Sequence, residues 1–367
     1  MVDPRWQDAR RILVVRLDNL GDVLLATPAI HSVRRALPEA SLTLLAGPAG
    51  APVAELNPDL DGVVVYRAAW MDPERALPRD PVREQAAIAD LKRRQFDGAI
   101  IFTSYHQSSL PAAYLCYLAD VPLRHAASLD GPGSLLTTRH RPSEGVVHEV
   151  ERGLDLVSGL GVPAAEDDLV LRPRLEDVQA MEKLVARARP SGRPALVLHP
   201  GCSQPARTYP PDLFARAAVA LEDELGARIF WTGSASESLL VTEIQQAARL
   251  AGALDGGINL AGQTDLSSLA ALIGAVDAVV TNNTGPMHVA AAMKTPVAAL
   301  FALTNPPEEW HPWKVPYRLL NHDVSCRVCY QRVCPHGHEC LRLVTADEIV
   351  AATAGLLTER AAGRRAA

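Results

Sequence analysis

Short apolar runs, each followed by an amphipathic segment, repeat along the chain and limit the folds that it can adopt. In the first half these runs are a few residues long and rich in valine, leucine and isoleucine: 11–17, 41–47, 62–66 and 97–103. A helical pattern at 86–95 separates the last two runs. Strands that alternate with helices in this way are typical of βαβ units and a mostly parallel sheet.

The same alternation starts again after the Pro/Gly-rich segment PSGRP. A second series of predicted strands follows, at 195–201, 227–233, 258–262, 275–283 and 295–301. A helical pattern lies between the first two of them, in PDLFARAAVALEDEL. We therefore expect an α/β protein with two Rossmann-like domains that face each other across a cleft, where ligands bind at the carboxyl ends of parallel strands.

These patterns also predict the domain boundaries. The chain has 367 residues, which is long for one domain and agrees with two. We expect an N-terminal domain at 1–165, a linker region at 166–194 that includes a charged helix, and a C-terminal domain at 195–345. The remaining residues, 346–367, are predicted to form a C-terminal helix and a disordered tail.

The composition excludes some classes of protein. Hydrophobic residues make up 48% and charged residues 21% of the chain, as in ordinary globular proteins. A net charge of −6 gives no general reason to expect nucleic-acid binding. The charged N-terminus is unlike a signal peptide, and no apolar run reaches the roughly 18 residues that span a bilayer. We expect a cytoplasmic protein whose local basic clusters are solvated faces or contacts to an anionic acceptor or membrane surface.

The first motif is GD at Gly21 and Asp22, where the first predicted strand turns into a helix. Glycine allows a ligand to approach the backbone, and the free N–H groups of a helix start attract anions. Asp22 is also placed to cap the helix, whose dipole favours an ionised carboxylate. An ionised carboxylate at the edge of a cleft can accept a proton from an attacking hydroxyl. The turn alone leaves all three roles open: helix cap, phosphate turn and proton acceptor.

The second motif is LHPGCSQPARTYP, in which a predicted strand ends at a Pro-Gly turn. Ser203 and Arg207 follow on the strand-end loop, before a helix that opens at Pro210. A hydroxyl and a guanidinium in such a loop can hold a diphosphate. An ordinary connector with a surface arginine is the alternative.

The third motif begins at Asn283, where a buried strand ends, and continues through Thr284 and Gly285 into a small-residue helix. The start of this helix is a second candidate anion site. His288 lies in its first turn and faces either a ligand or the core. Glu237, after another strand end, can accept hydrogen bonds from a ribose or can simply begin a helix.

The fourth motif is the cluster CRVCYQRVCPHGHEC. Its four cysteines lie within fifteen residues: Cys326, Cys329, Cys334 and Cys340. Four thiols so close together can bind one structural zinc ion or an iron–sulfur centre. Their spacing matches no standard zinc-finger arrangement, so packed reduced thiols and redox chemistry stay open as alternatives.

In this order and spacing the chain resembles glycosyltransferase family 9, the ADP-heptose:lipopolysaccharide heptosyltransferase family. The resemblance covers most of the chain and rests on five segments: RLDNLGDVLLATPAI, HEVERGLDLVSGLGV, LHPGCSQPARTYP, VTNNTGPMHVAAAMKTPVAALF and the cysteine cluster. It implies a GT-B architecture, with the acceptor on the N-terminal half and the nucleotide sugar on the C-terminal half. It also implies an inverting transfer that requires no metal or other cofactor.

The resemblance further implies roles for individual residues. Asp22 matches the catalytic base that deprotonates the acceptor hydroxyl, with Gly21 beside it in the acceptor-side loop. The other matching residues bind the donor: Ser203 and Arg207 at the diphosphate, Glu237 at the nucleoside, and Asn283, Thr284, Gly285 and His288 in the donor loop and helix start. The implied donor is a nucleotide-diphosphate sugar, and ADP-heptose is the leading candidate. The implied acceptor is the lipopolysaccharide core or another lipid-linked surface glycan at the cytoplasmic face of the inner membrane.

Two departures from the family pattern bear on the donor. Asn283 stands where the family usually has an aspartate that contacts the sugar, and Ala302 replaces a common glycine. Other functions stay open beside the transferase: a GT-B nucleotide-sugar epimerase, or a non-catalytic module that binds nucleotide sugar or senses metal. A dinucleotide-dependent oxidoreductase is disfavoured, because no GxGxxG follows the first strand.

Overall fold

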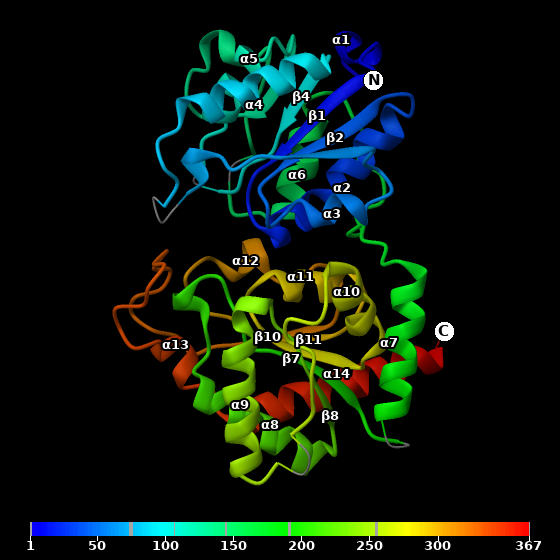
Figure 1. The fold of residues 1–367 in the computed structure, drawn as a ribbon, viewed down its shortest axis with the longest axis vertical. Helices are drawn as coiled ribbons and strands as arrows, with labels where there is room; N and C mark the ends of the chain where they lie inside the picture. The colour runs from blue at the N-terminus through cyan, green and yellow to red at the C-terminus, as the bar shows by residue number, and fades with distance from the viewer. Residues whose placement is uncertain are drawn as a thin grey trace. The chain divides into compact units, whose positions relative to one another are not determined.

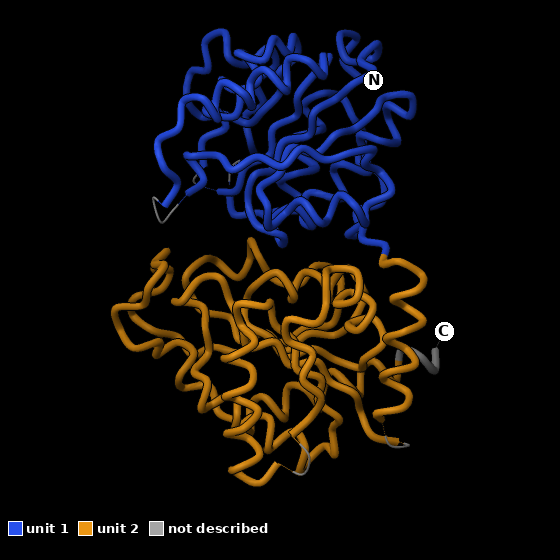
Figure 2. The backbone as a smooth tube through the Cα atoms, in the orientation of Figure 1, with its two compact units in different colours: residues 1–172 blue, residues 173–367 orange. Residues whose placement is uncertain are grey.

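The computed structural model describes residues 2–72, 76–105, 107–143, 145–189, 192–253 and 256–366. The chain divides into two compact units, unit 1 at Met1–Arg172 and unit 2 at Pro173–Ala367 (Figure 2). Among the described residues no helix is both long enough and apolar enough to cross a membrane.

Unit 1 is built on a parallel six-stranded sheet with the strand order β3-β2-β1-β4-β5-β6. Its strands are β1 (Arg11–Arg16), β2 (Ser41–Ala46), β3 (Gly62–Val65), β4 (Gly98–Ile101), β5 (Leu123–Ala127) and β6 (Thr138–His140). The central strands β1 and β4 are buried on both faces, which explains why their sequences are continuous apolar runs.

Helices cover both faces of this sheet. They are α1 (Pro4–Gln7), α2 (Leu20–Ala36), α3 (Pro52–Glu55), α4 (Pro81–Arg94), α5 (Leu110–Leu118) and α6 (Glu149–Ser158). Figure 1 shows α4 and α5 on one face and α2, α3 and α6 on the other. The face toward α4 and α5 contains a core cluster in which Leu13 and Val15 pack with Leu91 and Cys116.

Unit 2 repeats the same topology. Its parallel sheet has the order β12-β11-β10-β7-β8-β9. The strands are β7 (Ala195–His199), β8 (Arg228–Trp231), β9 (Ile258–Asn259), β10 (Ala278–Asn282), β11 (Val297–Leu300) and β12 (Tyr317–Leu320). In both units the strand order reverses beside the first strand, between β1 and β4 and between β7 and β10.

The helices of unit 2 again lie on both faces of the sheet. They are α7 (Leu175–Ala188), α8 (Pro211–Leu225), α9 (Ser238–Leu250), α10 (Leu266–Ala275), α11 (Gly285–Ala292), α12 (Pro307–Trp310), α13 (Glu339–Arg342) and α14 (Ala346–Ala366). Figure 1 shows α8, α9 and α14 together on one face, where they enclose a core with Leu196, Leu198 and Val280.

Two sequence-based boundaries differ from the structure. The predicted linker 166–194 is divided between the units: the Val170 N–H donates to Thr27 Oγ1 in unit 1, whereas α7 packs on α10 in unit 2. At the C-terminus, where the sequence suggested a helix followed by a disordered tail, α14 runs from Ala346 to Ala366. Its buried Ile349 and Leu356 pack in the core of unit 2, and this contact holds the helix on the sheet.

The reversal of strand order determines where a site can form. At such a point the two central strands send their connections to opposite faces of the sheet, which leaves a crevice at the carboxyl ends of the strands. In unit 1 the residues at this point follow β1 and β4, and in unit 2 they follow β7 and β10. The GD turn and the donor-loop motifs of the sequence lie at three of these four strand ends, after β1, β7 and β10.

Candidate active site

Asp22 lies in the first turn of α2, just after β1 ends at Arg16. Its Oδ2 accepts a hydrogen bond from the backbone N–H of Asn19, the N-cap residue, at 3.0 Å. The capping role expected from the sequence is therefore present, with the carboxylate satisfying an N–H that the helix itself cannot. Gly21 is buried beside it in the same turn.

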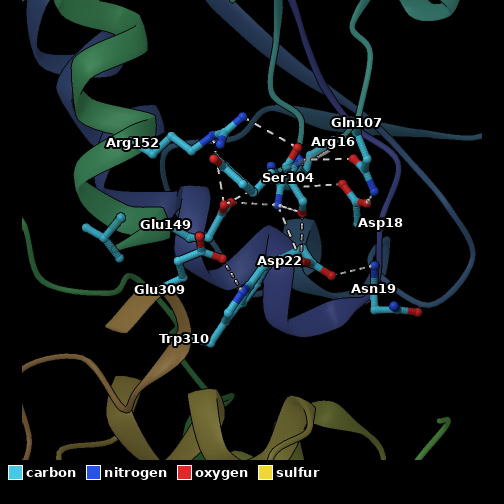
Figure 3. Close-up of polar contacts among 12 residues, drawn as sticks. Arg16, Asp18, Asn19, Asp22, Ser104, Gln107, Glu149, Arg152, Glu309 and Trp310 are labelled. Atoms are coloured by element: carbon cyan, nitrogen blue, oxygen red, sulfur yellow. Dashed lines mark hydrogen bonds and ion pairs between the residues drawn. The ribbon is translucent and has the colours of Figure 1, made fainter. Parts of the chain in front are cut away.

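The guanidinium of Arg16 is buried among three carboxylates, with a side chain only 3% exposed. Its Nε lies 3.0 Å from Asp18 Oδ2. Its Nη2 lies 3.4 Å from Asp22 Oδ1 and 3.3 Å from Glu149 Oε2 (Figure 3). Burial opposes the charge on Arg16, but Asp18, Asp22 and Glu149 outweigh it and raise the pKa of the guanidinium, which stays protonated.

Ser104, in the loop after β4, connects this arginine to Asp22. Its hydroxyl accepts a hydrogen bond from Arg16 Nη2 at 2.7 Å and donates to Asp22 Oδ1 at 3.3 Å (Figure 3). Gln107 in the same loop donates to Asp18 at 2.6 Å and accepts from the Ser104 N–H at 3.0 Å. The loops after β1 and β4 thus form one polar network around the Asp22 carboxylate.

The surroundings of Asp22 make it a better proton acceptor than an ordinary aspartate. Burial raises the pKa of Asp22 to about 6, and the negative charges of Asp18 and Glu149 act in the same direction. Arg16 and the Asn19 N–H lower it, but not enough to cancel the rise. The position of Asp22 at the helix start therefore has less effect on its pKa than its burial has. With a pKa of about 6, Asp22 is still ionised in most molecules at pH 7.

A pocket in unit 1 opens directly beside this carboxylate. Apolar side chains and backbone from α2, α6 and the ends of β4 and β5 line it, with polar groups at one end: Arg16, Asp22, Leu25, Ala26, Ile101, Phe102, Thr103, Ala127, His140, Pro142, Glu149, Arg152, Gly153 and Leu156. His140 at its rim is held by Asp155 at 2.8 Å. A hydroxyl-bearing ligand in this pocket would reach Asp22.

In unit 2 a buried asparagine, Asn282, joins the ends of β7 and β10. Its Oδ1 accepts from the Tyr209 N–H at 3.0 Å, and its Nδ2 donates to the Pro200 carbonyl at 2.7 Å. One side chain thus fixes both ends of the loop that contains Ser203 and Arg207. Ser203 is exposed on this loop, as a ligand-contacting hydroxyl requires.

Arg207 begins a chain of hydrogen bonds that runs to Asn283. Its Nε donates to Thr304 Oγ1 at 3.0 Å, and the Thr304 hydroxyl donates to Asn305 Oδ1 at 3.2 Å. The same Asn305 oxygen accepts from Asn283 Nδ2 at 3.2 Å, while Asn283 Oδ1 accepts from the Ala302 N–H at 3.3 Å. Asn283 is therefore engaged within the protein at both ends of its amide and connects the loops after β10 and β11.

Glu237 lies just before α9, beside the end of β7. Its Oε2 accepts from the N–H and the hydroxyl of Ser234, at 2.7 and 2.8 Å. A Cβ on Gly201 would lie 2.2 Å from the Glu237 carboxyl carbon, so only glycine lets the β7 loop pass this close. His199 Nε2 is 3.9 Å away, and burial lowers the pKa of His199 to about 4 despite Glu237. His199 is therefore neutral beside a helix-start acid.

The remaining candidates lie at the start of α11. Thr284 is its half-buried N-cap residue, Gly285 is the first helical residue, and His288 is buried one turn on. The Cys202 thiol of the neighbouring loop is hydrogen-bonded to the Thr284 side chain. Unit 2 thus gathers the predicted donor residues at the β7 and β10 strand ends, while Asp22 and Gly21 belong to unit 1.

The cysteine loop, residues 326–340, contacts the same two loops. The Ala206 N–H donates to the Arg332 carbonyl at 2.9 Å, and the Tyr330 N–H donates to the Thr304 carbonyl at 2.8 Å. His338 Nε2 lies 3.0 Å from the Pro205 carbonyl. All four cysteines are free thiols, and the described residues contain no group of three or more potential ligands that could hold a metal ion as placed.

Comparison with known proteins identifies the family to which the chain belongs. Residues 85–339 match the family model described as glycosyltransferase family 9 (heptosyltransferase). The chain belongs to glycosyltransferase family 9. It is 26% identical over 317 residues to lipopolysaccharide heptosyltransferase 2 of Escherichia coli, covering 81% of this chain and 84% of that protein.

Solved structures of family members share the fold. A family 9 glycosyltransferase from Veillonella parvula superposes with a TM-score of 0.78 at 19% identity, over 95% of this chain and 98% of that one. ADP-heptose lps heptosyltransferase II of E. coli superposes with a TM-score of 0.72 at 21% identity, over 96% and 99%. The predicted GT-B fold is thus confirmed, and the protein is a glycosyltransferase.

Some residues of the site were not among those singled out from the sequence. Arg16, Ser104 and Glu149 surround Asp22, and Thr304 and Asn305 hold Arg207. A charged residue at the end of the apolar run RILVVRL was the available signal for Arg16. The others follow strands or begin a helix far away in the sequence, where a single chain gives no sign of the pairing.

Proposed function

We propose that this glycosyltransferase transfers heptose, with inversion, from ADP-heptose to the core of lipopolysaccharide or a related lipid-linked glycan. The observation that supports this most directly is the buried Asp22 carboxylate, held in a polar network at the edge of a pocket in unit 1. The relatives named as lipopolysaccharide heptosyltransferases supply the substrate class.

In the proposed reaction Asp22 takes the proton of an acceptor hydroxyl as its oxygen attacks the anomeric carbon of the donor sugar. The bond from that carbon to the diphosphate oxygen breaks on the opposite face, so the configuration inverts. The departing ADP keeps the electron pair. In this reaction the protein must supply a base on the acceptor side and a positive group at the diphosphate. The reaction needs no metal or other cofactor.

The donor would bind to unit 2, where we assign the diphosphate to Arg207 and Ser203 and the ribose to Glu237. The planar guanidinium can bind a phosphate through two N–H donors, and Thr304 orients it from the Nε side. Thr284, Gly285 and His288 complete the donor loop. The internal bonds of Asn283 indicate that it supports this loop rather than supplying a charge to the sugar.

Replacement of Asp22 by alanine tests the base. We expect transfer from ADP-heptose to heptose-free lipopolysaccharide core, measured as ADP release, to be lost, because the proposed acceptor of the hydroxyl proton is removed. The affinity for ADP in calorimetry should stay nearly unchanged, since Asp22 belongs to the other unit. Full activity in Asp22→Ala or Asp22→Asn would show that the base is another group.

Replacement of Arg207 tests the diphosphate site. Arg207→Ala removes a charge-assisted hydrogen bond worth roughly 1.5–3 kcal/mol, so ADP should bind about ten-fold more weakly or worse. Arg207→Lys should restore only part of the affinity, because the ammonium lacks the planar fork. Arg216→Ala, an exposed arginine on α8, is the matched control. Unchanged ADP affinity in Arg207→Ala would place the diphosphate elsewhere.

For the cysteine loop we propose a structural zinc or iron centre formed by the four thiols. The Cys334 sulfur already accepts backbone N–H groups from His336 and His338, at 3.4 and 3.2 Å, as metal-bound thiolates do. Burial raises the pKa of the Cys340 thiol, and the negative charges of Cys326, Cys329 and Cys334 act in the same direction. Metal binding would still require the thiols to converge.

Metal analysis of the untagged protein tests this centre. We expect about one zinc, or iron with or without sulfide, per chain. Removal by a chelator should weaken ADP binding, because the loop is bonded to both loops that hold Arg207. Protein that purifies without metal and still binds ADP fully would leave only packed thiols or redox chemistry.

The acceptor side also suggests peripheral contact with the cytoplasmic membrane face. Helix α5 contains no charged residue, and its outer side exposes Tyr114, Tyr117 and Leu118. Such a helix is usually buried on all sides. Tyrosines favour the membrane interface, and the last turn of the adjacent α4 contains the basic run 92–94, which suits anionic lipids.

A vesicle assay tests this contact. The full chain should sediment with phosphatidylglycerol vesicles and less with neutral ones. The double variant Tyr114→Ser/Tyr117→Ser should lose most of this binding, whereas Leu239→Ser, on an exposed position of unit 2, should not. Equal sedimentation of all three proteins would rule out α5 as the contact.

A non-transferring enzyme of similar fold is the second candidate. An epimerase would convert its nucleotide sugar without an acceptor, and a binding module would not consume it at all. Incubation of the protein with ADP-heptose alone and with acceptor separates the three, because a transferase releases ADP in step with glycosylated acceptor.

A further inference from the structure

Glu149 contacts residues outside the helix that it begins. It is the first residue of α6, and its side chain is only 3% exposed. Its Oε2 lies 3.3 Å from Arg16 Nη2, and its Oε1 accepts from the Tyr105 N–H at 3.4 Å. A carboxylate this deeply buried costs free energy unless it is paired, and its closest cation is the arginine that also contacts Asp22 (Figure 3).

Arg16 divides its contacts unequally. The Nη2 atom makes its short hydrogen bond, 2.7 Å, to the neutral Ser104 hydroxyl. Its distances to Asp22 and Glu149 are 3.4 and 3.3 Å, longer than the roughly 2.7–2.9 Å of strong guanidinium–carboxylate bonds. Arg16 Nη2 therefore forms no short bond to either Asp22 or Glu149.

The charges around Asp22 do not balance. Asp18 from the β1–α2 loop and Glu149 from α6 add two negative charges to that of Asp22. On the cationic side, the described residues that line this pocket add Arg152, whose Nε lies 3.9 Å from Glu149, and His140. With all three carboxylates ionised, this buried group has one negative charge more than its two arginines neutralise.

We propose that Glu149 is a positioning residue for the base: it holds Arg16 away from a tight pair with Asp22, so that Asp22 keeps its affinity for a proton. The inference rests on the proposed role of Asp22. It assigns to Glu149 no contact with the reacting atoms. Asp18 acts in the same way from the Nε side of Arg16.

The isosteric variant Glu149→Gln separates this role from simple support. Its size is unchanged, and its one amide oxygen can still accept from either the Tyr105 N–H or Arg16 Nη2, which bond to different oxygens of Glu149. Loss of the negative charge lets Arg16 pair more tightly with Asp22, which favours the ionised carboxylate. The acidic limb of kcat/KM, measured with ADP-heptose and heptose-free core, should move to lower pH by about one unit. The plateau rate should fall, because the base is weaker.

Two controls accompany this measurement. Glu149→Asp keeps the charge and should return the limb toward the wild-type pH. Glu151→Gln, two residues along the same helix and exposed, should leave the limb in place, since glutamine can still accept from the His148 N–H. A limb that stays at the wild-type pH in Glu149→Gln would overturn the proposal. If that variant does not fold, Asp18→Asn must show a shift in the same direction.

A second readout needs no substrate. Carboxyl carbon NMR, with the Asp22 signal assigned by comparison with Asp22→Asn, follows the titration of Asp22 directly. Glu149→Gln should lower its midpoint by the same amount. A lowered Asp22 midpoint in a protein that does not use ADP-heptose would support the role of Glu149 and reject the proposed heptose transfer. Normal turnover of the wild-type protein, with an unchanged Asp22 midpoint in Glu149→Gln, would support the reaction and reject the role of Glu149.

Discussion

The parallel pairing of β1 with β4, and of β7 with β10, is the constraint on which the site depends. Val15 is paired with Ile101 and Thr281 with His199, so the residues that follow these strands emerge level with one another. Parallel strands require crossovers, and here the crossovers leave to opposite faces of each sheet. The polar loops can therefore approach one another without displacing apolar core.

Unit 1 shows the energetic cost of placing polar groups at these strand ends. Arg16 continues a strand that is otherwise apolar, and its guanidinium is removed almost completely from water. Only the carboxylates and the Ser104 hydroxyl from three other segments make that burial tolerable. The same groups leave Asp22 incompletely neutralised, so the burial of Arg16 and the raised pKa of Asp22 have one physical origin.

Much of this could be predicted from the sequence, and the reasons for the rest are physical. Continuous apolar runs indicated β1, β4, β7 and β10 because those strands are covered on both faces. Strands β5, β6 and β12, at or next to the edges of their sheets, were not predicted, since each contains a charged residue. Arg124 of β5 satisfies its guanidinium with the carbonyls of Ser134 and Leu135. GD, Arg207 and the donor helix were recognisable as strand-end motifs.

The partners of those motifs were not recognisable. Arg16 and Glu149 are 133 positions apart, and Asn283 and Asn305 are joined only because β10 and β11 are neighbours. The fold brings such pairs together, and they cannot be predicted from composition or from the local spacing of residues. Helix α14 likewise depends on distant contacts, because Ile349 and Leu356 pack in the core of unit 2.

The amide pair of Asn283 and Asn305 has a consequence for how this family diverges. With asparagine at 283, the Asn305 oxygen receives hydrogens from both Thr304 and Asn283. An aspartate at 283 would present an oxygen to that oxygen, and the amide of residue 305 would have to turn and offer its nitrogen instead. Thr304 would then lose its acceptor. Positions 283, 304 and 305 are therefore expected to change together among related chains, so that a single substitution at position 283 leaves a hydrogen bond of this network unmade.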